Sequence, residues 1–100
     1  MNTETKTNGY EAERIQPMIA KFERAAQKLF PDCTIRHFYY GDCLDMVDVL
    51  LAPGRYAHFN VSANRVSLTG YTCSDEDLKK FESMTYRDEL YSGKLLDIAE

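Results

Sequence analysis

The chain has 100 residues, which fits a single domain, and its 44% hydrophobic residues supply enough apolar side chains for one core. A charged fraction of 28%, with five glycines and three prolines, excludes disordered and collagen-like chains. The net charge of −4 arises in residues 74–100, which contain eight acidic and four basic residues, so this end disfavours nucleic acid and anionic lipid as partners.

The N-terminal third predicts a disordered tail and then a long amphipathic helix. Residues 1–8 are polar and are expected to be the tail, with one domain over 9–100. Asn8 and Glu11 fit a helix cap, and Pro31 ends the helix. Pro17 predicts either a kink or a regular helix that begins near Gln16. The apolar stripe has helical spacing and consists of Ile15, Met18, Ile19, Phe22, Ala26, Leu29 and Phe30.

The middle of the chain predicts antiparallel strands. Residues 34–40 are β-branched and aromatic, and Gly41-Asp42 is a turn sequence. Residues 44–51 fit a strand or a helix capped by Asp42; we favour the strand because the turn sequence at 52–55 leads into another strand. As a strand, this segment places Asp45 and Asp48 on opposite faces.

The clearest hairpin is predicted over residues 56–69. Ala57, Phe59 and Val61 alternate with polar residues, Ala63-Asn64 makes a tight turn, and Val66 and Leu68 alternate in the returning strand. One apolar and one polar face indicate that the sheet is covered on one side only, by the first helix.

A short acidic helix is predicted to begin after Ser74, with Leu78 and Phe81 buried. Thr85 and Asp88 fit a cap for a further turn through Leu90, and residues 94–100 fit a strand, a helical turn or a tail. The predicted fold class is therefore α+β: an N-terminal helix on one face of a three- to four-stranded antiparallel meander, followed by a short acidic C-terminal helix.

Metal and nucleophile chemistry receive little support from the residue spacing. Cys33 and His37 are four apart, roughly 13 Å along a strand, and Cys33, Cys43 and Cys73 lack the spacing of a zinc site. We expect three reduced thiols, no cofactor and no metal. Cys43 lies between two carboxylates, Asp42 and Asp45, which oppose thiolate formation.

Two further groups of residues resemble functional sites in their spacing. Asp42, Asp45 and Asp48 fit a hard-cation or acid–base cluster, but turn formation and protection of a sheet edge explain them more simply. Arg36 alternates with two aromatic residues, Phe38 and Tyr40, as on some sheets that stack nucleic-acid bases, but few basic residues accompany them and Phe38 fits the core.

The acidic C-terminal region has the density of charge that an interaction surface needs. It predicts a small non-enzymatic protein-binding module that occludes a basic site on a larger protein, as accessory or inhibitor proteins of phages and mobile elements do. We expect a cytoplasmic protein without membrane or direct nucleic-acid partners. The predicted partner-binding residues are Asp75, Glu76, Asp77, Glu82, Tyr86, Asp88, Glu89 and Tyr91.

Two alternatives remain open at this level. One is a small-ligand or enzymatic domain on the polar sheet face, with Tyr56, His58 and Asn60 as its cluster. The other is a structural homo-oligomer joined through the uncovered sheet face or an edge strand.

Overall fold

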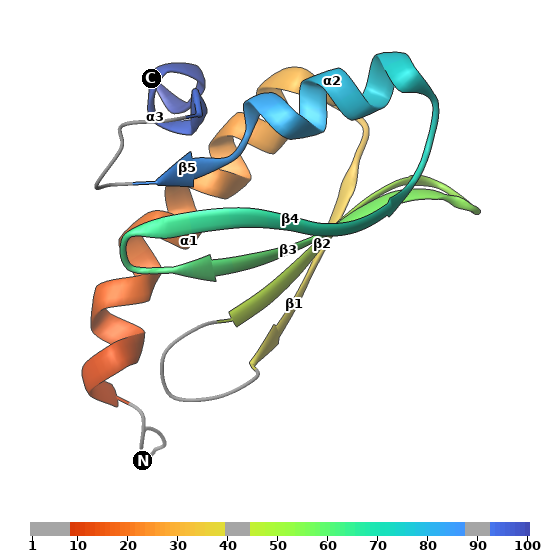
Figure 1. Ribbon diagram of the computed structural model, residues 1–100. Coiled ribbons are helices and arrows are strands. Elements are labelled where there is room, and N and C mark those ends of the chain that lie inside the picture. The colour runs from red at the N-terminus through yellow and green to blue at the C-terminus, as the bar shows by residue number, and fades with distance from the viewer. Residues whose placement is uncertain (1–8, 40–44, 88–92) are drawn as a thin grey trace.

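A computed structural model describes residues 9–39, 45–87 and 93–100 and has α+β architecture (Figure 1). Its five strands form one open antiparallel sheet in the order β1-β2-β3-β4-β5. The predicted fold class is confirmed, with one more strand than expected, and the predicted tail lies outside the described residues. The elements in chain order are α1 (Gly9–Leu29), β1 (Thr34–Tyr39), β2 (Asp45–Ala52), β3 (Arg55–Ser62), β4 (Arg65–Thr72), α2 (Asp75–Ser83), β5 (Tyr86–Arg87) and α3 (Leu95–Ala99).

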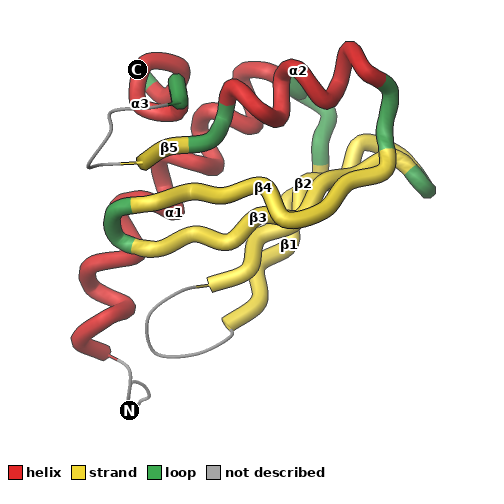
Figure 2. The backbone as a smooth tube through the Cα atoms, in the orientation of Figure 1, coloured by secondary structure: helices red, strands yellow, loops and turns green. Residues whose placement is uncertain are grey.

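Helix α1 packs against one face of the sheet, with α2 and α3 on the same side (Figure 2). The predicted stripe is buried as expected except for Leu29, which is half-buried, and the fully buried ring of Phe22 meets Phe59 of β3 edge to face at 4.8 Å. The helix begins at Gly9, so a start near Gln16 is wrong: Ile15, which precedes Pro17, is already part of the buried stripe. No helix within the described residues is long and apolar enough to cross a membrane.

The predicted strand at 44–51 is confirmed as β2, which lies between β1 and β3. The predicted hairpin is confirmed as β3 and β4, with Ala57, Phe59 and Val61 fully buried under the helices. Thr69 is an extra residue in β4, because Phe59 pairs with Leu68 while His58 pairs with Gly70. This bulge bends the strand, and the Thr69 hydroxyl donates to the His58 carbonyl at 3.1 Å.

Helix α2 begins as predicted after Ser74, whose hydroxyl accepts a hydrogen bond from the backbone N–H of Asp77 at 3.1 Å. Phe81 is fully buried between Phe30 and Phe59, at ring distances of 4.7 and 6.0 Å. The expectation that Leu78 is equally buried is wrong: Leu78 is half-buried, and the second buried residue of the helix is Asp77.

The segment after α2 differs from its prediction. Tyr86 and Arg87 form the short strand β5 beside Val66 and Arg65 instead of a helical turn, because the free edge of β4 offers backbone hydrogen bonds that a capped turn does not. Residues 95–99 form α3, which packs on α1 and is tied to it by a hydrogen bond from Arg24 Nε to the Ala99 carbonyl at 3.1 Å.

Candidate functional site

The face of the sheet opposite the helices carries a mixed polar and aromatic surface, which we call the open face. Residues paired directly across antiparallel strands point to the same side, so the strand register defines its members. One row across the sheet reads Arg36, Asp48, His58 and Gly70 from β1 to β4. The rows on either side of it are Phe38, Met46, Asn60 and Ser67, and Thr34, Leu50, Tyr56 and Thr72.

An aspartate–histidine pair lies at the centre of the open face. Asp48 Oδ1 is 2.7 Å from His58 Nδ1, and the two side chains are 14% and 40% exposed. The carboxylate favours the tautomer with its proton on Nδ1, so Nε2 is directed away from Asp48. The ring of Tyr56 contacts the imidazole at 4.8 Å. The predicted cluster of Tyr56, His58 and Asn60 therefore shares one face, and it includes Asp48, which was not part of that prediction.

A cation and an exposed aromatic ring lie beside this pair on β1. The guanidinium carbon of Arg36 is 5.4 Å from the ring centre of Phe38, whose side chain is 40% exposed. The register neighbour of Arg36 is Asp48, which is already bound to His58. Among the described residues Arg36 therefore has no carboxylate partner. The expectation that Phe38 belongs to the core is wrong, because Phe38 shares the face of Arg36 and not that of Ile35.

A second aspartate–histidine pair lies on the other face of the same sheet. His37 Nε2 is 2.8 Å from Asp45 Oδ2, and Asp45 is buried on the helix side. Asp45 and Asp48 therefore lie on opposite faces of the sheet and cannot bind the same cation. Both belong to β2, which is an interior strand, so neither carboxylate protects a sheet edge. Asp42 lies outside the described residues.

The predicted acidic surface is only partly available. Asp77 is buried, and its carboxylate accepts hydrogen bonds from Arg55 Nε at 2.7 Å and from a terminal guanidinium nitrogen at 2.9 Å. These bonds hold the pKa of Asp77 below its ordinary value, against the opposing effect of burial. Asp77 thus joins α2 to β3, while Asp75, Glu76 and Glu82 remain exposed on α2.

The two tyrosines predicted as partner contacts are Tyr86 and Tyr91. Tyr86 was expected to be exposed, but it is 8% exposed because its strand pairs with β4 and turns the ring toward the core. Asp88, Glu89 and Tyr91 lie outside the described residues.

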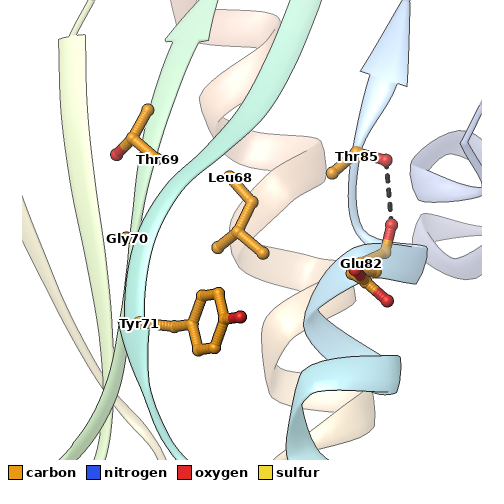
Figure 3. A pocket seen from close by; sticks show the side chains of 6 residues that line it. All are labelled: Leu68, Thr69, Gly70, Tyr71, Glu82 and Thr85. Atoms are coloured by element: carbon orange, nitrogen blue, oxygen red, sulfur yellow. Dashed lines mark hydrogen bonds between the residues drawn. The ribbon is translucent and has the colours of Figure 1, made fainter.

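A hollow of about 500 Å³ lies between β4 and α2 on the helix side of the sheet (Figure 3). Leu68 and Tyr71 point into it from β4, and Glu82 and Thr85 border it from the other side, where the Thr85 hydroxyl donates to the Glu82 carbonyl at 2.8 Å. Tyr71 is 51% exposed, so it is comparable in exposure to Phe38 but lies on the opposite side.

The thiols are poorly suited to nucleophilic chemistry. Burial raises the pKa of Cys33, and burial together with Asp77 raises the pKa of Cys73. Both are free, and Cys43 lies outside the described residues. Within the described part of the chain, no group of three or more histidine, cysteine or acidic residues is arranged to hold a metal ion.

Comparison of the chain with family models, curated proteins and solved structures found no match.

Proposed function

We propose that this protein is a non-enzymatic protein-binding module and that the open face is its contact surface. The exposed ring of Phe38 carries this proposal together with the apolar side chains beside it, since a contiguous apolar patch marks an interaction surface. Met46, Leu50 and Tyr56 are half-buried on the same face and extend its apolar area. Aromatic residues together with arginine are typical of the centre of protein interfaces.

The charge of the open face supports a protein partner more than a nucleic acid. Binding to nucleic acid is driven largely by basic side chains that each neutralise a phosphate, and a typical binding site makes several such contacts. The described residues of this face include three arginines, Arg36, Arg65 and Arg87, and these are spread over β1, β4 and β5, while the chain as a whole is acidic. A protein partner needs no such neutralisation, because desolvation of apolar side chains supplies most of its binding energy.

The Asp48–His58 pair fits an orienting role better than a catalytic one. Catalytic proton transfer depends on a site that encloses the substrate and excludes water, whereas the imidazole of His58 is 40% exposed on the sheet surface. In an interface the same pair supplies a fixed donor and acceptor. A steering role for Asp75, Glu76 and Glu82 toward a basic partner, and an origin in a phage or mobile element, stay predictions from the sequence.

The proposal is tested by affinity capture with immobilised protein from a lysate of the organism that encodes it. Wild type is compared with Phe38→Glu and with the matched control Tyr71→Glu, which places the same charge at an equally exposed ring on the helix side. We expect wild type and Tyr71→Glu to retain the same partner and Phe38→Glu to lose it. Both variants should melt within a few degrees of wild type, since exposed substitutions cost about 0.5 kcal/mol or less. Retention by Phe38→Glu would contradict the proposal.

A further inference from the structure

In two of the rows that β1 shares with β4, the open face carries large side chains on β1 and small residues on β4, and the strand register fixes this asymmetry; Arg65 of β4 lies beyond these rows. Its β1 side carries Arg36 and Phe38, whereas the residues at the same heights on β4 are Gly70 and Ser67. A Cβ atom at Gly70 would meet only the His58 ring, at 3.5 Å, so the glycine is not required by its backbone or by crowding. Its effect is to leave a shallow space beside His58 on the open face.

We propose that the partner of the open face is a second copy of this chain, packed face to face about a two-fold axis that runs along the strands. This inference rests on the proposed function and names the partner for that surface. Rotation about such an axis keeps every residue at its position along the strand direction. It places β1 of one copy over β4 of the other, and β2 over β3. Arg36 of one copy then lies over Gly70 of the other, and Phe38 lies over Ser67.

The same operation makes the charged centre self-complementary. It brings Asp48 of each copy over His58 of the other, so carboxylate and imidazole groups alternate around the axis. The apolar row behaves in the same way, because Leu50 lies over Tyr56. A two-fold axis that runs across the strands instead places each strand over the same strand of the other copy. Both copies of Arg36 then lie in the same half of the interface, where their charges repel. Shape and charge therefore both favour the axis along the strands.

The acidic surface does not oppose this arrangement. Helix α2 lies on the helix side of each sheet, and packed layers are about 10 Å apart, so two copies of α2 would be separated by roughly 30 Å. The Debye length at physiological salt is about 8 Å, so the repulsion between the two acidic surfaces is largely screened.

The area of the face sets the expected strength of the dimer. Eight-residue strands span about 26 Å and four neighbouring strands about 19 Å, so the planar face is about 500 Å². Two such faces bury about 1,000 Å² in total, which is the low end for a specific interface. Interfaces of this size are typical of weak and transient complexes, so we expect a dimer that dissociates on dilution through the micromolar range and not a permanent dimer.

Sedimentation equilibrium over about 1 µM to 1 mM tests this with the full chain. Gly70→Arg places a guanidinium against Arg36 of the other copy, and we expect it to weaken the dimer at least tenfold. The double variant Arg36→Glu with Gly70→Arg pairs opposite charges across the same contact and should return the dissociation constant to within about threefold of wild type. Tyr71→Glu, on the helix side, should leave it unchanged.

A wild-type chain that stays monomeric at every concentration, or a Gly70→Arg variant that dimerises like wild type, overturns the inference. Failure of the double variant to recover dimerisation overturns the strand-parallel axis and with it the inference. If the wild type is monomeric but Phe38→Glu still loses its captured partner, the inference fails while the proposed function stands. If the wild type is monomeric and Phe38→Glu retains the captured partner, both fail.

Discussion

Gly93→Ala tests how the C-terminal helix is joined to the rest of the fold. Gly93 has a φ of 85°, in the left-handed region that costs other residues about 1–2 kcal/mol. A Cβ atom here would also overlap the carbonyl group of Thr85 and approach the backbone nitrogen of Tyr86 to 2.9 Å. Since these are backbone atoms, the segment that carries Gly93 must move.

That movement has an energetic cost that follows from the contacts around it. The residues after Gly93 donate two backbone hydrogen bonds, from Lys94 to Ser83 at 3.1 Å and from Leu95 to Thr85 at 3.4 Å. Each contributes about 1 kcal/mol, and the fully buried Leu95 side chain contributes about 1.5–3 kcal/mol. With partial loss of these contacts added to the strain, we expect Gly93→Ala to lower the free energy of unfolding by about 3–5 kcal/mol.

Gly54→Ala is the matched control. Gly54 has a similar φ of 73°, but a Cβ atom there would meet nothing within 4 Å, so the strain of about 1–2 kcal/mol is the whole expected cost. The same side chain is added in both variants, so the effect on the unfolded chain cancels in the comparison.

Urea unfolding followed by far-UV circular dichroism measures the difference. With a slope of about 1–3 kcal/mol per molar urea, a difference of about 2 kcal/mol moves the midpoint of Gly93→Ala about 0.7–2 M below that of Gly54→Ala. Equal midpoints would refute the reasoning, because they would mean that the close approach of Gly93 to Thr85 carries no energetic weight.

Three further outcomes are expected. The pKa of Asp77 is lowered in the folded protein, so the ionised carboxylate stabilises the fold above its ordinary pKa near 4. This stabilisation is lost on acidification, and the urea midpoint should therefore fall more between about pH 5 and pH 3 in wild type than in Asp77→Asn. Phe59→Ala, at a fully buried ring between two helices, should cost about 3–5 kcal/mol by urea unfolding; a cost below 1 kcal/mol would contradict the described core. In a Cys43→Ser background, the raised pKa values of Cys33 and Cys73 predict alkylation by iodoacetamide at pH 7 more slowly than free cysteine, and faster than free cysteine would contradict them.

Local patterns in the sequence were sufficient to predict α1, the hairpin of β3 and β4, and the start of α2. The three- and four-residue spacing around Phe22 predicts a helix buried along that stripe, and alternation around Phe59 predicts a strand buried on that face. Ser74 and the acids after it predict the start of α2 to the residue. Each of these depends on contacts within a few residues of the chain, which a one-dimensional pattern expresses directly.

The functional surface required the register between distant strands. The sequence predicts that Asp45 and Asp48 face opposite ways, but only the pairing of β1, β2 and β3 decides that Asp45 meets His37 and Asp48 meets His58. Likewise, Asp77 resembles any first-turn acid until the turn after β2 brings Arg55 to it.

The sequence by itself therefore determined one amphipathic helix, a one-sided meander and an acid-rich second helix, because side-chain periodicity follows backbone geometry. The tertiary structure alone decided that Phe38 faces water, that Tyr86 is buried and that the carboxylate of Asp77 is paired with Arg55. These outcomes depend on which elements meet and in what register, and that information is spread over the whole chain and not held in any local pattern.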